Sequence, residues 1–236
     1  MVLVHGTGAD HTRWTAVREQ LARRYRLYLV DRRGRGLSRD EAGAYDIRRE
    51  GADIAAVAEA AGGDVYLIAH SYGALCALEA VLATGAVSRL LAYEPPRPKP
   101  GEFVVGPDAR RRMAAASEPE EILEIFLREA LRLTAVDVEA MRRTPVWPAR
   151  VAAAPTIPRE LAVVEAMVFG ERLGEISIPV RLLAGTESPA YLRLAAEAVA
   201  ERIPGAGVVP LHGQAHQAMD FDPDQFVKAV FDFSRG

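Results

Sequence analysis

Short apolar runs that alternate with amphipathic helical segments constrain the fold of this chain more than any other feature of its sequence. Six runs have the length of buried strands, and the segments between them repeat apolar residues at helical spacing. The six runs lie at residues 2–4, 27–30, 65–69, 90–93, 180–184 and 207–211. Strands that are apolar throughout and separated by helices indicate a parallel sheet with both faces covered. We therefore predict an α/β fold with a mostly parallel sheet flanked by helices on both faces.

Residues 97–175 interrupt this alternation, because they contain helical patterns and no convincing strand. They follow a proline-rich passage, and proline seldom continues a regular element. Ser117 and Glu120 have the spacing of a capping box, which predicts that the first long helix of this stretch begins at Ser117 and runs to about Leu133. A second, short helix is expected after Thr134 and a third after Pro158. The sequence thus predicts a core formed by residues 1–96 and 176–236, with residues 97–175 as an inserted helical cap.

Composition excludes several classes of function. The formal net charge of −3 provides no long-range field that would attract nucleic acid. Cys76 is the only cysteine, so an intramolecular disulfide and a cluster of metal-binding thiolates are both excluded. The five histidines lack a recognisable metal-site spacing, and we expect neither a metal nor a cofactor. Three apolar residues precede His5, and no apolar segment approaches the roughly 18 residues of a membrane span, so we expect a cytoplasmic protein without membrane contact.

The most specific chemical signal is the segment Ala-His-Ser-Tyr-Gly at residues 69–73, between a predicted strand and a helical pattern. A serine on such a turn lies at the carboxyl end of the strand and at a helix N-terminus, where unpaired amides favour negative charge. The hydroxyl of Ser71 could therefore attack a carbonyl carbon while the amide of Tyr72 receives the oxyanion.

This segment resembles the nucleophile elbow, G-x-S-x-G, of the α/β-hydrolase superfamily, with Ala69 in place of the first glycine. Residues 5–8, His-Gly-Thr-Gly, resemble the oxyanion loop of that superfamily, in which Thr7 would supply the second amide by its position. As a phosphate-binding loop the same residues lack the P-loop lysine. Residues 31–38 resemble the D-x-R-G-x-G-x-S loop that follows the next strand in these hydrolases. The resemblance implies a serine hydrolase with Ser71 as its nucleophile.

A general base is expected after the last strand, where His212 and His216 are both present. The superfamily pattern G-x-x-H places the base three residues after Gly213, which selects His216. A neutral imidazole that contacts a serine can take its proton near neutral pH.

The carboxylate that orients the base has two candidates. The usual superfamily pattern G-x-x-D places it at Ser188, which is better explained as a helix N-cap, and Glu187 lies one residue earlier. Haloalkane dehalogenases use the end of an earlier strand instead, and here Glu94 follows the predicted strand at 90–93. We favour Glu94 and keep Glu187 as the alternative; the task of either would be to hold the imidazole in one tautomer.

The resemblance implies hydrolysis of a small carboxylic ester or lactone through an acyl-enzyme at Ser71, with His216 as general base. Two other interpretations remain open: a noncatalytic ligand-binding protein with the same fold, and a cofactor-free perhydrolase or carbon–carbon hydrolase that uses the same residues. Superfamily members normally carry two antiparallel strands before the His-Gly loop, whereas this sequence enters the third strand directly. The strand at 27–30 is then an open edge, and we expect another chain to pair with it, as in a homo-oligomer, or another segment to cover it.

Overall fold

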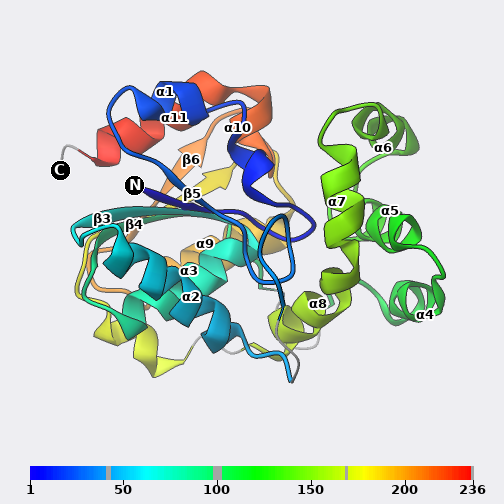
Figure 1. The fold of residues 1–236 in the computed structure, drawn as a ribbon, viewed down its shortest axis with the longest axis horizontal. Coiled ribbons are helices and arrows are strands. Elements are labelled where there is room, and N and C mark those ends of the chain that lie inside the picture. The colour runs from blue at the N-terminus through cyan, green and yellow to red at the C-terminus, as the bar shows by residue number, and fades with distance from the viewer. Residues whose placement is uncertain (41–43, 98–102, 168–169, 235–236) are drawn as a thin grey trace.

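The protein is described by a computed structural model that covers residues 1–40, 44–97, 103–167 and 170–234. Its centre is a six-stranded sheet in which each strand runs parallel to its neighbours (Figure 1). The strands are β1 (Val2–Val4), β2 (Tyr28–Val30), β3 (Val65–His70), β4 (Val87–Tyr93), β5 (Val180–Gly185) and β6 (Gly207–Leu211). Their order across the sheet is β2-β1-β3-β4-β5-β6. The predicted α/β fold with a mostly parallel sheet is confirmed.

Helices cover both faces of the sheet, as strands that are apolar on both sides require. One face carries α2 (Ile47–Ala60), α3 (Tyr72–Ala83) and α9 (Ala190–Ala200), and the other carries α1 (Arg18–Ala22), α10 (Ala218–Phe221) and α11 (Pro223–Phe233) (Figure 1). Side chains of β3 alternate between the two apolar clusters: Leu67 packs with the residues of α2 and α3, and its neighbours Tyr66 and Ile68 pack with those of α1 and α11. The sheet is therefore the middle layer of three.

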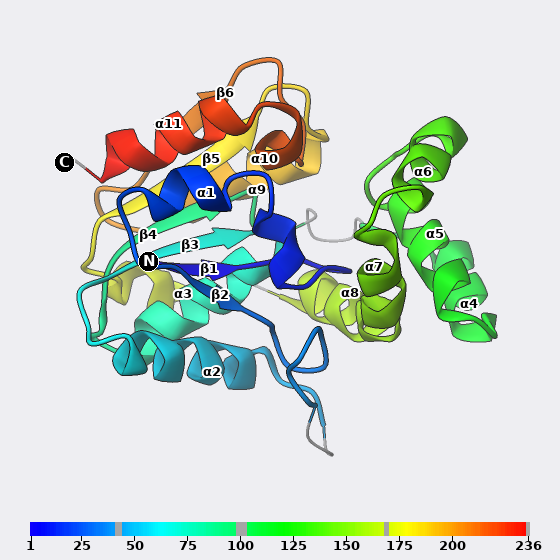
Figure 2. The same ribbon diagram turned by 45° about the horizontal axis from the view of Figure 1, so that its top comes forward.

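The chain between β4 and β5 forms a group of helices, here called the insertion helices. They are α4 (Pro107–Ala115), α5 (Pro119–Glu129), α6 (Ala135–Arg142), α7 (Trp147–Ala153) and α8 (Ile157–Ala166). Figures 1 and 2 place them beside the carboxyl ends of the strands, with α7 and α8 nearer the sheet than α4, α5 and α6. Open α/β sheets bind their ligands at this edge.

Proline lies in the first turn of α4, α5, α7 and α8, whereas α6 begins after Thr134, which forms a capping box with Asp137. The expectation that Ser117 and Glu120 form a capping box is wrong, because α5 begins at Pro119 with Glu118 as its N-cap residue and has no side-chain cap. Proline has a φ angle close to the helical value and lacks the N–H that would stay unpaired at this position, so it suits the first turn. Two of the insertion helices, α4 and α7, had no counterpart in the sequence prediction.

A buried ion network joins α8 to the loop that follows β2. Glu160 of α8 is fully buried and accepts hydrogen bonds from the guanidinium groups of Arg32 and Arg35. Glu50 of α2 accepts from both arginines as well, with Arg32 Nε at 2.7 Å. Because buried charges are tolerated only when they are paired, this network fixes the insertion helices to the core.

The sequence also led to expectations about the edge of the sheet at β2 and about contact with a membrane. Within the described residues β2 has β1 as its one neighbour, and Tyr28 and Leu29 are half-buried. Pairing of this edge with a second copy of the chain stays a prediction. In the described ranges no helix combines the length and the hydrophobicity needed to cross a lipid bilayer.

Candidate active site

Ser71 occupies the sharp turn between β3 and α3. It has φ 55° and ψ −128°, a backbone conformation that a serine adopts only when its surroundings enforce it. Its amide donates to the carbonyl oxygen of Tyr93 at 2.8 Å. Close packing around the turn excludes side chains at two positions: a Cβ added to Gly6 would lie 2.7 Å from Ser71 Cβ, and one added to Gly73 would lie 2.3 Å from the His5 carbonyl oxygen. The unfavourable backbone conformation of Ser71 is therefore maintained by neighbouring backbone segments, which approach one another closely at Gly6 and Gly73.

Two backbone amides beside Ser71 are available as donors. Thr7 lies in the loop after β1, and Tyr72 is the first residue of α3. In the described parts of the chain no oxygen accepts a hydrogen bond from either amide, and the Ser71 hydroxyl has no partner. Unpaired amides at a helix N-terminus favour negative charge in front of them. The arrangement can thus receive an oxygen that becomes negative.

The side chain of Tyr72 contacts other residues. Its hydroxyl lies 2.9 Å from the Tyr45 hydroxyl, and the Arg32 guanidinium lies 4.7 Å from the centroid of its ring. Burial raises the pKa of the Tyr72 phenol, which therefore stays neutral. We conclude that Tyr72 can serve the candidate site through its backbone amide.

His216 lies in the loop after β6 and contacts Glu94, which directly follows β4. The distance between His216 Nδ1 and Glu94 Oε2 is 2.5 Å, and Glu94 is fully buried. The other carboxylate oxygen, Glu94 Oε1, accepts from the amide of Gly185 at 2.7 Å. A proton on Nδ1 is shared with the carboxylate, which leaves Nε2 with a lone pair that can accept another proton.

Two further contacts hold the loop that carries His216. His70 Nε2 lies 2.8 Å from the His216 carbonyl oxygen and donates to it, and the two rings have centroids 4.5 Å apart. Burial, reinforced by the nearby His216, lowers the pKa of His70 well below its ordinary value, so this ring is neutral. The Tyr93 hydroxyl donates to the carbonyl oxygen of Ala215. Because both donors act on the backbone, the position of His216 depends on residues at the ends of β3 and β4.

The alternative acid, Glu187, lines the same cleft as His216 but forms no hydrogen bond or ion pair with it among the described residues. It is exposed, and its carboxylate accepts from the Thr186 hydroxyl at 3.3 Å. Of the two candidate carboxylates, Glu94 is the one that contacts the His216 ring in the described part of the chain. The expectation that Ser188 caps a helix is wrong, because Pro189 is the N-cap residue of α9 and the buried Ser188 Oγ has no hydrogen-bond partner among the residues that the structure describes.

Three cavities meet around these side chains. Two small ones, each of about 20 Å³, are both lined by Thr7, Ser71 and His216. A cleft of about 940 Å³ adjoins them; it is also lined by His216 and is bounded by α6, α7 and the segment around η1 (His11–Trp14). His216 therefore lies both on the cleft and on the two small cavities that it shares with Ser71.

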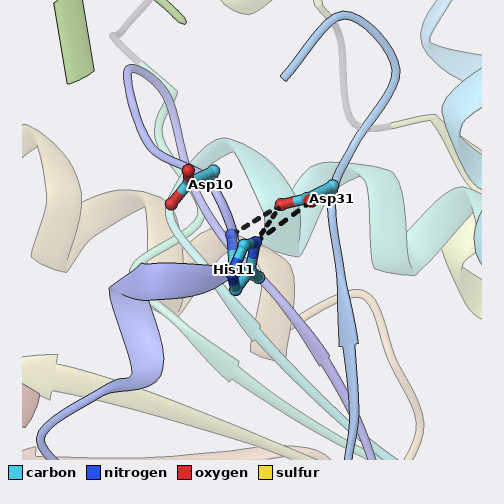
Figure 3. Close-up of side chains that lie close together, drawn as sticks. All are labelled: Asp10, His11 and Asp31. Atoms are coloured by element: carbon cyan, nitrogen blue, oxygen red, sulfur yellow. Dashed lines mark hydrogen bonds and ion pairs between the residues drawn. The ribbon is translucent and has the colours of Figure 1, made fainter. Parts of the chain in front are cut away.

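One group of possible metal ligands is present among the described residues, namely Asp10, His11 and Asp31, whose ligand atoms lie within 4.8 Å of one another. Figure 3 shows the Asp31 carboxylate directed at His11, with Nδ1 to Oδ1 at 2.8 Å, whereas no contact is drawn from Asp10 to either. Asp31 also accepts from the Leu37 amide, and Asp10 accepts from the Thr12 amide at the start of η1. Both carboxylates therefore have hydrogen bonds that hold the loops after β1 and β2 in shape.

Known proteins resemble this chain along almost its whole length. A family model described as the alpha/beta hydrolase family matches residues 1–229. RutD of Azorhizobium caulinodans, provisionally named a carbamate hydrolase, is 26% identical over 245 residues, which cover 99% of this chain and 90% of RutD.

Solved structures show the same similarity. An alpha/beta hydrolase from Sphaerobacter thermophilus is 30% identical, with a TM-score of 0.83 and coverage of 98% of this chain and 91% of that one. The esterase RhEst1 from Rhodococcus sp. ECU1013 is 28% identical, with a TM-score of 0.77 and coverage of 98% and 88%. The family match, the parallel sheet and these similarities together show that the chain belongs to the alpha/beta hydrolase family.

Proposed function

We propose that this alpha/beta hydrolase cleaves a small carboxylic ester or lactone through an acyl-enzyme formed on Ser71. The observation that carries the proposal is the 2.5 Å contact between Glu94 and His216 beside two cavities that His216 shares with Ser71. The esterase named among the similar structures supports the same class of substrate.

In the first half of the proposed reaction, Ser71 Oγ attacks the carbonyl carbon while His216 Nε2 accepts the hydroxyl proton. The carbonyl oxygen becomes an oxyanion, which the amides of Thr7 and Tyr72 stabilise; one such donor is worth about 3 kcal/mol in comparable hydrolases. Glu94 stabilises the imidazolium that results. The imidazolium then gives its proton to the departing alcohol oxygen, and the acyl group stays on Ser71.

In the second half, water replaces the alcohol. His216 Nε2 takes a proton from the water as its oxygen attacks the acyl carbon, and the same two amides hold the second oxyanion. Collapse of this intermediate breaks the bond to Ser71 Oγ, which recovers its proton from His216. The products are a carboxylic acid and the alcohol, and the enzyme returns to its starting protonation state.

Ser71 chemistry is tested with a fluorophosphonate probe, which reacts covalently with activated serines. Wild-type protein should be labelled and Ser71→Ala should not, whereas the exposed Ser117→Ala serves as a matched control and should be labelled as the wild type is. A folded wild type that takes no label would favour the noncatalytic ligand-binding alternative. Screening short-chain p-nitrophenyl esters, lactones and carbamates then ranks the substrate classes by kcat/KM.

A further inference from the structure

Arg150 is a buried cation without a direct partner in the described part of the chain. It lies on α7 and is 7% exposed, and no hydrogen bond or ion pair of its side chain is found among the described residues. Burying an unpaired charge is costly, so a guanidinium in such a place normally contacts a carboxylate or a carbonyl oxygen. Its five N–H donors are available to an acceptor outside the chain.

A second buried arginine, Arg13, lies near Arg150. Burial, reinforced by the charge of Arg13, lowers the pKa of the Arg150 guanidinium to about 10, so the group remains charged at neutral pH. Two carboxylates, Asp220 and Asp10, act on the charge of Arg150 electrostatically. Asp220 forms an ion pair with Arg13, and Asp10 accepts hydrogen bonds from the amide and the hydroxyl of Thr12. Within the described ranges, Arg150 is thus left without a direct counter-charge.

The position of Arg150 connects it to the proposed chemistry. The first small cavity is lined by both arginines together with Thr7, Ser71 and His216. The second small cavity shares those three residues, and both cavities are also lined by Phe126 and Leu131. The rest of the second wall is mostly apolar, with Pro96, Val104, Leu161 and Val164. Its one carboxylate, Glu160, is held by the buried ion network. Ser71 therefore lies where a cavity that contains two arginines meets one that contains neither of them.

We propose that Arg150, assisted by Arg13, binds a carboxylate group of the substrate, so that the enzyme acts on esters that carry a free carboxylate on one side of the scissile bond and an apolar group on the other. The proposal rests on the proposed function, because it assigns the substrate class of the same site. A guanidinium matches a carboxylate with two parallel hydrogen bonds, which fixes the substrate as well as attracting it. Arg150 is in these terms a specificity residue.

Two pairs of esters isolate the carboxylate. Monomethyl succinate carries it on the acyl side, with methyl 4-methylpentanoate as its neutral isostere. O-acetylglycolate carries it on the alcohol side, with isobutyl acetate as its neutral isostere. For each pair, the ratio of kcat/KM for the charged ester to kcat/KM for the neutral one measures selectivity, with proton release as the signal.

We expect Arg150→Met to lower at least one of the two ratios by about tenfold or more, since hydrogen bonds to charged groups have this magnitude. Arg150→Lys keeps the charge but loses the paired donors, and should give an intermediate ratio. The exposed Arg128→Gln is the matched control and should leave both ratios as they are in the wild type. The proposal is overturned if both ratios in Arg150→Met stay within tenfold of the wild type.

Binding of succinate separates this proposal from the proposed function. Calorimetric titration of Ser71→Ala with succinate should show binding at millimolar concentrations, and adding Arg150→Met should weaken it about tenfold or more. If the wild type cleaved none of the four esters, the proposed function would fail. The titration would still test whether Arg150 binds a carboxylate, because it does not depend on turnover. Absent succinate binding, or binding that Arg150→Met leaves unchanged, would overturn the carboxylate proposal.

Discussion

Glu94 Oε2 lies 2.5 Å from His216 Nδ1, although the two residues are 122 positions apart in the chain. Glu94 directly follows β4, and His216 lies in the loop after β6. In the sheet, β5 lies between β4 and β6 and ends at Gly185. The Gly185 amide donates a hydrogen bond to the second carboxylate oxygen, Glu94 Oε1. Because both oxygens are engaged, the carboxylate can hold the imidazole in one orientation and one tautomer.

Replacing Glu94 by glutamine should lower the turnover of an activated ester by about tenfold or more, because the amide lacks the charge that stabilises an imidazolium. The measurement is kcat for p-nitrophenyl acetate in the purified variant.

Glu187→Gln is the matched control for this change, because Glu187 is exposed and bonds to Thr186. Its kcat should stay within about twofold of the wild type, as is usual for an exposed side chain that forms no hydrogen bond to a catalytic group. If Glu187→Gln were the more damaging of the two, Glu94 would not be the acid.

The parallel sheet was predictable because buried strands leave a local signature. Each of the six predicted apolar runs overlaps a strand, and the boundaries differ by at most a few residues, as at β4, which begins at Val87 rather than at residue 90. Residues whose place follows from a strand end, such as Ser71 and Glu94, could be proposed on the same basis. The contact between Glu94 and His216 adds what the sequence left open, namely which carboxylate reaches the ring.

The features that the sequence did not reveal depend on packing between distant segments. Arg150 is a candidate ligand-binding residue only because α7 packs near the segment that carries Arg13, and α7 itself was not predicted. Nothing in the local pattern distinguishes Arg150 from the other arginines of residues 97–175, most of which pair with carboxylates on the surface.

Gly6→Ala should reduce kcat/KM by about 100-fold, because displacing a catalytic group by a fraction of an ångström to one ångström has effects of this size. The added Cβ would meet Ser71 Cβ at 2.7 Å and the His70 carbonyl oxygen at 3.1 Å, so either the oxyanion loop or Ser71 must move. Gly85→Ala is the matched control, because nothing lies within 4 Å of its Cβ position. Equal kcat/KM values in the two variants would show that the close contact at Gly6 is not needed for activity.

Glu160→Gln should lower the free energy of unfolding by about 3–5 kcal/mol, the range observed when one partner of a buried ion pair is removed. The change leaves Arg32 and Arg35 with Glu50 as their one shared carboxylate. Glu124→Gln provides the comparison: its pairs lie on the surface, and the expected loss is below about 1 kcal/mol. Urea unfolding at neutral pH measures both, and similar losses in the two variants would mean that the buried network does not anchor α8.

The stability of the protein should fall in acid partly through His5, which is fully buried with Nδ1 on the Gly6 carbonyl oxygen and Nε2 accepting from the Arg32 amide. Burial, reinforced by Arg32, lowers its pKa from 6.5 to about 3. Below pH 6.5 the unfolded chain therefore binds a proton that the folded chain rejects, and the free energy of unfolding declines by up to about 1.4 kcal/mol per pH unit until pH 3. Urea unfolding between pH 7 and pH 4 measures this slope. In His5→Gln the free energy of unfolding should fall less steeply with pH, by the contribution of one proton, whereas the exposed His212→Gln should keep the slope of the wild type. A slope unaltered by His5→Gln would mean that His5 already takes up a proton in the folded protein.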